Sequence, residues 1–441
     1  MKYWVFAVSA LMAPFAAYVL SWDRRWLRFA AVAAVLSLCF YRQTSITFSA
    51  VPDYRGTALG FEVGFAHLAA LAILGALALR GERIDWIPGR GAKLFLLYSA
   101  LCLPSFTSAA EPLYAMFEVW KMALLYLFFL ALYNCMRATD GAGPVLFALG
   151  IFAFVNFGFV AHQHFAGVWQ PKGLFDHRNS SAFCMNVLGP LFFAGFLMKG
   201  GGTSWGRFCF AAFVCAAFSA LRAYSRTALA LTPLGYGVAW AMCMARGRPR
   251  NAAGRTVFLA ALAAAALAVM LPRFIQRFET AGSGSANYRI ESARCALEMI
   301  ADEPLRGVGL NNWGLKINPP YPYARRAGVD RGHMERGSFY QDGIVETVYL
   351  LVAAECGVPC LLALVAWLLH YAALSFRLCR RLAGDPLFFV AAGLAGGLSV
   401  ICIESSMEWI LRMRQNLMLQ VVFFALLDHL AARARREGGR T

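Results

Sequence analysis

Four segments of this 441-residue chain place arginines or possible proton acceptors beside long apolar runs. Several arginines at one membrane face suit a substrate with a diphosphate group. Guanidinium groups bind phosphate oxygens bidentately and offset the charge that builds on a leaving diphosphate. Transfer to a hydroxyl group also needs a base that takes the hydroxyl proton. The residue types therefore suit group transfer from a lipid-linked diphosphate.

The first segment is GLFDHRNSS at residues 173–181, directly before an apolar run. Lys172, His177, Arg178 and Asn179 stand where a helix N-terminus would add unpaired N–H groups and a partial positive charge, which suits an anion. The alternative is a capped helix with interfacial anchors, in which Asn179 or the serine after it is the N-cap. We name these four residues as candidate substrate ligands.

The second segment is AYSRTALAL at residues 223–231, in which Arg226 opens an apolar helix after the turn at Tyr224 and Ser225. An arginine at a helix start opposes the helix dipole. It also lies on the side of the membrane where basic residues in short loops are disfavoured. Arg226 is therefore a candidate anion ligand, and the alternative is an arginine that reaches a lipid phosphate.

The third segment, residues 289–313, predicts an amphipathic helix that ends before Pro304. We expect its apolar face to pack on the helix bundle. This face consists of Ile290, Ala293, Leu297 and Ile300. Arg289 in the first turn and Arg306 beyond the end are further candidate ligands, or else solvated charges. The glycine-rich turn at residues 307–309 precedes no strand, so it indicates a tight corner rather than a dinucleotide fingerprint.

The fourth segment, residues 343–359, begins an apolar run in which we expect Glu346 to stand in the first helical turn. The helix dipole stabilises a carboxylate at that place, and this carboxylate would face whatever the arginines hold. Glu346 is therefore a candidate base, or an ordinary acidic residue at a helix start. His333 and Glu335 precede it in the same polar stretch.

The elements that must position these residues are membrane helices. Hydrophobic residues make up 60% of the chain, charged residues 15%, and the mean hydropathy is +0.56, which excludes an ordinary soluble protein. One crossing needs about 20 apolar residues. On that measure we expect an all-α polytopic bundle of 12–13 transmembrane helices with one large periplasmic loop domain that contains short helices. The expected parts are 1–272 (about ten spans), 273–342 (loop), 343–432 (about three spans) and 433–441 (basic cytoplasmic tail).

The net charge of +17 is spread over short connections, so it does not form the continuous basic stripe of a nucleic-acid-binding protein. Short loops rich in Lys and Arg stay cytoplasmic. Four such clusters are Arg80, Arg83, Arg90 and Lys93; Arg246, Arg248, Arg250 and Arg255; Arg377, Arg380 and Arg381; and Arg433, Arg435 and Arg436. Counting spans between them puts the long loop, together with 173–181, 222–226 and 404–408, outside the cytoplasm and the C-terminus inside. The side of the N-terminus stays open.

Cysteines and charged residues inside the apolar runs allow functions other than group transfer. Nearly all of the twelve cysteines lie in apolar runs, so no disulfide framework is implied. Cys356 and Cys360 stand one helical turn apart without a His or carboxylate at ligand spacing, which favours packing over metal binding. Charges inside spans would be the working parts of a transporter or flippase, with Glu62 and His67, or Glu118 and Lys121, as candidates. A structural ion pair is the alternative for Glu118 and Lys121.

The order of the four segments resembles the O-antigen ligase and O-antigen polymerase superfamily of bacterial membrane glycosyltransferases, over about residues 173–359. Members carry Gly-Phe-x-x-x-Asn before a span, Ser-Arg at the next helix start, an Arg-initiated helix running into Pro-Leu-x-Gly-x-Gly, and His-Asn-x-Tyr-Leu before a further helix and a Gly. The residues that match are Gly173, Phe175, Asn179, Ser225, Arg226, Arg289, Pro304, Leu305, Gly307, Gly309, Tyr349, Leu350 and Gly357. Glu346 and Thr347 stand where the family has His and Asn.

The resemblance implies a glycosyltransferase of the bacterial inner membrane that takes a glycan from an undecaprenyl diphosphate-linked donor at the periplasmic side. Arg226 and Arg289 would hold the diphosphate, Tyr349 would contact substrate, and no metal ion or other cofactor would be needed. Glu346 would be the base because a carboxylate can accept a proton as His does, with His333 and His177 as the next candidates. The acceptor stays open between lipid A core, another glycan chain and a protein hydroxyl.

Overall fold

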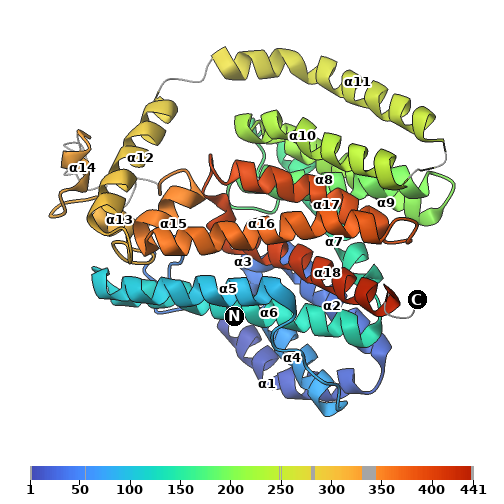
Figure 1. Cartoon of the computed structure of the whole chain (residues 1–441), viewed down its shortest axis with the longest axis horizontal. Helices are drawn as coiled ribbons and strands as arrows, with labels where there is room; N and C mark the ends of the chain where they lie inside the picture. The colour runs from blue at the N-terminus through green and yellow to red at the C-terminus, as the bar shows by residue number, and fades with distance from the viewer. Residues whose placement is uncertain are drawn as a thin grey trace. The chain divides into compact units, whose positions relative to one another are not determined.

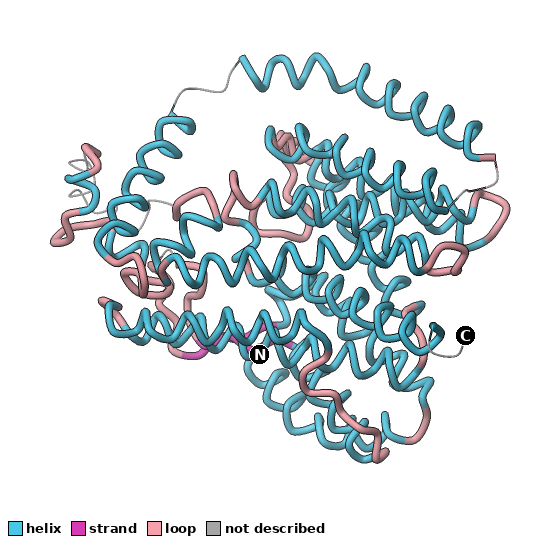
Figure 2. Tube along the Cα trace, viewed as in Figure 1, coloured by secondary structure: helices cyan, strands magenta, loops and turns pink. Residues whose placement is uncertain are grey.

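The computed structural model describes residues 2–54, 56–247, 249, 251–279, 284–329 and 344–438. Across these residues the chain is almost wholly helical, with two short strands (Figures 1 and 2). The all-α fold class is confirmed.

The elements in chain order are α1 (Lys2–Ser21), α2 (Arg24–Leu36), η1 (Ser37–Phe40), α3 (Tyr41–Thr44), β1 (Ser45–Phe48), β2 (Phe61–Gly64), α4 (Phe65–Leu79), α5 (Gly89–Cys102), η2 (Leu103–Ser108), α6 (Pro112–Thr139), α7 (Gly143–Phe165), α8 (Arg178–Lys199), α9 (Ser204–Arg222), α10 (Arg226–Met242), η3 (Cys243–Gly247), α11 (Ala252–Glu279), α12 (Gly284–Asp302), α13 (Trp313–Lys316), α14 (Tyr323–Arg326), α15 (Val348–Cys356), α16 (Val358–Arg381), α17 (Phe388–Glu404), η5 (Ile410–Arg412) and α18 (Arg414–Gly438).

Eight helices in the described residues are long and apolar enough to cross a membrane: α1, α6, α7, α8, α9, α10 with η3, α16 and α18. Three shorter apolar helices are α4, residues 252–262 of α11, and α17. Two further apolar runs that we count among the 12–13 expected spans also form shorter helices. The run at 27–41 is the 13-residue α2 followed by a 3₁₀ turn, and the run at 94–108 is the 14-residue α5, which turns into 3₁₀ helix at Pro104.

The chain divides into two compact units, which are described separately. Unit 1 comprises residues 1–148, 288–370 and 405–429, and unit 2 comprises 149–287, 371–404 and 430–441. Helices α7, α12, α16 and α18 contribute residues to both. The expected domain boundaries at 272, 342 and 432 stay a prediction.

In unit 1, α4 packs against α1, α2 and α6. A small antiparallel hairpin precedes α4, with Ser45 paired to Gly64 and Phe48 to Phe61. At the start of α4, the Gly64 N–H donates to His67 Nδ1 at 2.9 Å, so His67 caps its own helix. Glu62 instead pairs with Arg414 at 3.1 Å. Each residue of the candidate pair Glu62 and His67 therefore has its own separate structural partner.

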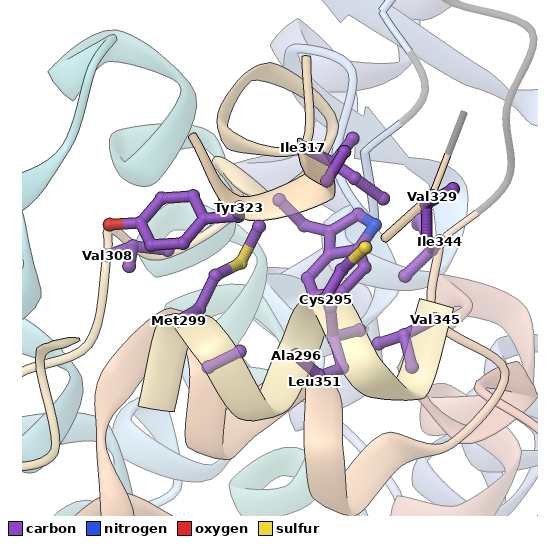
Figure 3. Packing of buried hydrophobic residues seen from close by; sticks show 13 residues of the cluster. Cys295, Ala296, Met299, Val308, Ile317, Tyr323, Val329, Ile344, Val345 and Leu351 are labelled. Carbon is purple, nitrogen blue, oxygen red and sulfur yellow. The ribbon is translucent and has the colours of Figure 1, made fainter. Parts of the chain in front are cut away.

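A cluster of buried side chains in unit 1 joins α12 to the segments that follow it and to α15 (Figure 3). Figure 3 shows Cys295 and Met299 from α12 sharing it with Ile317, Ile344 and Leu351. Helix α12 ends at Asp302, before Pro304, as the sequence predicts. Its expected apolar face is wrong at Ile290 and Leu297, which are more than half exposed, whereas Ile300 does pack against the core. The buried residues of the helix are Ser292, Cys295, Ala296 and Met299. The loop segments cover the opposite side of this helix.

The run at 344–374 is broken at Gly357, which ends α15 with φ +83°. The glycine-rich turn at residues 307–309 packs against this break. The Val308 N–H donates to the Ala354 carbonyl at 2.8 Å, and the Gly309 N–H donates to the Glu355 carbonyl at 3.0 Å, so the turn satisfies the last carbonyls of α15. The expected tight corner is confirmed, and its task is to cap a helix.

In unit 2, α8 is the central helix and packs against α9, α10 and α17. Glycines on α17 permit the close approach. A Cβ on Gly393 would stand 2.4 Å from the Leu191 Cα, and one on Gly396 would stand 2.1 Å from the Gly235 carbonyl oxygen. Small residues at helix contacts are what hold apolar helices together where water exclusion cannot.

Candidate functional site

Arg289 forms the centre of a charged cluster in unit 1. Its Nε donates to a carboxylate oxygen of Glu346, and its Nη2 donates to Glu408 Oε1 at 3.0 Å. The Arg289 side chain is 35% exposed, Glu346 27% and Glu408 6%. The arginine therefore stays accessible while one of its two carboxylates is buried beneath it.

The two carboxylates use one edge of the guanidinium group. Arginine carries five N–H donors, and the remaining ones, including those on Nη1, form no bond with the rest of the described chain. That free edge has the fork geometry that binds two phosphate oxygens at once. The cluster thus holds an arginine in a fixed orientation and leaves a phosphate-binding edge open.

Glu346 is not in the first helical turn. Helix α15 begins at Val348 and Thr347 is its N-cap, so Glu346 lies just outside the helix. The start of this helix is tied to the connection that carries Glu408, because the Val348 N–H donates to the Ser405 carbonyl at 2.9 Å. This backbone bond holds the segments that carry the two carboxylates next to each other. Tyr349 follows in the first turn of α15 and is half-buried.

In unit 2, two amide side chains shape the turn before α8. The Lys172 and Gly173 N–H groups both donate to Gln163 Oε1 at 2.9 Å, and the Leu174 N–H donates to Asn156 Oδ1 at 3.1 Å. Gly173 has φ +61°, and a Cβ there would stand 2.2 Å from Asn156 Oδ1. The glycine is therefore required by the turn, while the Lys172 side chain is exposed.

His177 is the N-cap of α8, rather than Asn179 or the serine after it. Its Nδ1 accepts from the Asn179 N–H at 3.2 Å, and its backbone is extended. Arg178 donates from Nη1 to the Gln170 side chain. Phe175 is buried and packs edge-on against Phe152. The expected anion ligands are thus part of a well-ordered helix start.

A second arginine in unit 2 stands near Arg226, and sequence reasoning missed it. Arg222 is 3% exposed, donates from Nη1 to the Tyr224 hydroxyl at 2.8 Å, and contacts His164 Nδ1. Tyr224 has φ +48° and stacks on Trp169. Arg226 is the first residue of α10, is half-buried, and forms no hydrogen bond or ion pair with the other described residues. Because no described residue pairs with the Arg226 guanidinium group, this group is open to an anion.

The remaining candidates are dispersed. Arg306 pairs with Glu303 at 2.9 Å beyond the far end of α12, about 20 Å of helix away from Arg289. The Arg306 hydrogen bonds lower the pKa of the exposed Glu303 carboxyl. His333 lies outside the described residues. Arg226 and Arg289 belong to different units, so their joint action stays a prediction.

A family model described as O-antigen ligase matches residues 211–365. Residues 211–365 of the chain, about a third of its length, therefore resemble an O-antigen ligase domain. No curated protein matches the chain. The resemblance to the O-antigen ligase and polymerase superfamily is thereby confirmed, and with it a glycosyltransferase-type enzyme of the membrane.

The matched segment contains Arg222, Arg226, Arg289 and Glu346. Glu408 lies beyond its end, and the helix start at His177 lies before it. Arg289 is therefore completed by a carboxylate from outside the matched segment. Glu408 had one sequence signal, its place in a connection on the same expected face as the arginines.

Unit 1 also contains a buried ion cluster, which links side chains of α6, α15 and η5. Glu118 pairs with Lys121 at 2.7 Å and with Arg412 Nη2 at 2.8 Å, and all three side chains are almost fully buried. The expected ion pair between Glu118 and Lys121 is present. Glu355 Oε2 lies 3.7 Å from the same Arg412 nitrogen, and burial raises the pKa of this carboxyl to about 7.

Proposed function

We propose that this protein transfers a glycan from an undecaprenyl diphosphate-linked donor to a hydroxyl acceptor at the periplasmic face of the inner membrane. The observation that carries the proposal is Arg289, held by Glu346 and Glu408 with its other edge open, inside an O-antigen ligase domain. Arg289 binds the diphosphate. Arg226 is the second proposed ligand, because it belongs to the Ser-Arg motif and pairs with no other described residue. Lys172, Arg178 and Asn179 are proposed further contacts for substrate.

The reaction needs little beyond charge and a base. The acceptor oxygen attacks the anomeric carbon of the donor sugar, the new carbon–oxygen bond forms, and the bond to the diphosphate oxygen breaks. Undecaprenyl diphosphate leaves with the bonding electron pair, and the acceptor proton passes to a carboxylate. Arginine offsets the charge on the leaving diphosphate without a metal ion.

Glu346 is the proposed base and Glu408 the proposed anchor. Glu346 is 27% exposed and can meet an incoming hydroxyl, whereas Glu408 at 6% exposure cannot. A buried carboxylate that binds Nη2 instead fixes the direction of the guanidinium group. The carboxylate at the position where the family has His thus has the accessibility that the proton transfer requires.

The experiment that tests the proposal compares Arg289→Ala and Arg226→Ala with the wild-type chain in a strain that lacks its own copy. Surface glycan should disappear in both while the protein stays in the membrane at normal amounts. The carrier-linked glycans then identify the acceptor class. Long chains left on the carrier indicate a ligase, single repeat units a polymerase, and loss of glycan from a protein an O-oligosaccharyltransferase. Normal surface glycan in both variants overturns the proposal.

A further inference from the structure

Three cysteines from separate helices meet at one buried point in unit 1. Cys102 is the last residue of α5, Cys356 the last of α15, and Cys360 lies in the first turn of α16. Their sulfur atoms all lie within 4.8 Å of one another, and Cys102 and Cys360 are 3.3 Å apart. All three side chains are fully buried.

The break at Gly357 creates this arrangement. Cys356 and Cys360 end one helix and begin the next, so both sulfurs turn toward the end of α5 rather than lying along one helix face. In the described residues, no other three His, Cys, Asp or Glu side chains converge in this way. Small apolar packing would need only one such residue at each helix contact, not three sulfurs at one point.

The geometry fits a metal ion with three thiolate ligands. A metal–sulfur bond is about 2.3 Å long, which puts three ligands of a planar trigonal site about 4 Å apart. The three sulfur atoms lie no more than 4.8 Å from one another, with one pair 3.3 Å apart, and these separations are compatible with that value. Zinc prefers four ligands, and the cluster offers no fourth carboxylate or imidazole. Soft thiolate ligands select monovalent copper.

We propose that Cys102, Cys356 and Cys360 form a three-thiolate site for Cu(I). The ion replaces three thiol protons, which pass to solvent, and no oxidation state changes on binding. The site joins the end of α5 to the break between α15 and α16 and takes no part in the transfer step.

The test uses the full-length protein purified in detergent and reduced under nitrogen. Cu(I) is titrated against a chromogenic Cu(I) chelator that competes for the ion. The wild-type chain should take up one tightly held Cu(I), and its X-ray absorption spectrum should show three sulfur neighbours. Bound Cu(I) should also raise the midpoint of thermal unfolding. Cys102→Ser, Cys356→Ser and Cys360→Ser should each lose the tight site.

Cys39→Ser is the matched control, because Cys39 is buried in the same unit but lies outside the cluster. It should bind Cu(I) as the wild-type chain does. Three outcomes would overturn the proposal: no tight binding by the wild-type chain, nitrogen or oxygen neighbours in its spectrum, or a disulfide between two of the three cysteines after reduction. The spectrum of the wild-type chain decides the matter even if a serine variant fails to fold.

Discussion

Gly307 and Gly357 each pack against the backbone beside the other. A Cβ on Gly307 would stand 2.3 Å from the Glu355 carbonyl carbon, and one on Gly357 would stand 2.4 Å from the Leu305 carbonyl carbon. Both residues have positive φ, at +71° and +83°. Because neither glycine has a side chain, the two backbone segments can approach closely, and the corner after α12 can cap α15. This contact positions α15, which begins just after Glu346.

Gly307→Ala should destabilise the protein more than the matched change Gly328→Ala. Gly328 has a similar φ of +68°, but a Cβ there meets open space. The left-handed backbone alone costs about 1–2 kcal/mol for a residue with a side chain. Overpacking adds about 1–3 kcal/mol at Gly307 only. Thermal unfolding in detergent measures both, and equal shifts for the two variants would contradict the packing account.

Glu118→Gln should destabilise the protein strongly. The change leaves Arg412 and Lys121 buried without their shared counter-ion, and breaking a buried pair typically costs about 3–5 kcal/mol. Glu303→Gln removes one partner of the exposed pair with Arg306 and should leave the unfolding midpoint nearly unchanged. Similar midpoints for the two variants would show that the buried cluster is not structural.

The buried carboxyl of Glu355 should make stability depend on pH. Its pKa in the folded protein is about 7, raised by burial from an ordinary value near 4.5. The folded state therefore holds this proton more tightly than the unfolded state does. The contribution of this group is fully present below about pH 4.5 and is lost as the pH rises to about 7. Glu355→Gln mimics the protonated form and should flatten the unfolding midpoint between these pH values. A slope that persists in this variant would assign the effect to other groups.

His177 should be replaceable by another capping residue. Its imidazole accepts from the Asn179 N–H at the start of α8, and asparagine makes the same bond. We expect His177→Asn to keep both stability and glycan transfer, and His177→Ala to lose about 1 kcal/mol of stability. Measuring both unfolding and glycan transfer in each variant separates a helix-capping role of His177 from a substrate-binding role. Loss of transfer in the asparagine variant at normal stability would make His177 a substrate ligand.

Local signals in the sequence predicted the features that depend on neighbours in the chain. Pro304 stops α12, the glycines after it form a corner, and the apolar runs form helices. The apolar face of α12 was not predictable in this way, because its sequence offers one apolar stripe through Ile290 and Leu297 and another through Cys295 and Met299. Only the loop segments that cover the second stripe decide between them.

Contacts between distant residues could not be predicted from spacing. Glu408 reaches Arg289 from the connection after α17, and Cys102 reaches Cys360 from α5, each across more than a hundred residues of chain. Arg412 likewise pairs with Glu118 only once η5 and α6 are folded together. A charge or thiol in an apolar region signals that a partner exists. The fold alone identifies the partner.

Glu408→Gln and Glu346→Gln should separate orientation from proton transfer. Glutamine at 408 still accepts a hydrogen bond from Arg289 Nη2 but loses the charge, so donor binding should weaken moderately while the maximal rate stays close to normal. Glutamine at 346 cannot take the acceptor proton, so the maximal rate should fall about 100-fold or more with donor binding nearly unchanged. Arg289→Lys should impair both quantities, because an ammonium lacks the planar fork that spans two carboxylates and a phosphate. Rates measured against donor concentration in reconstituted membranes give the two quantities separately. If Glu408→Gln abolishes the rate and Glu346→Gln leaves it intact, the buried carboxylate is the base.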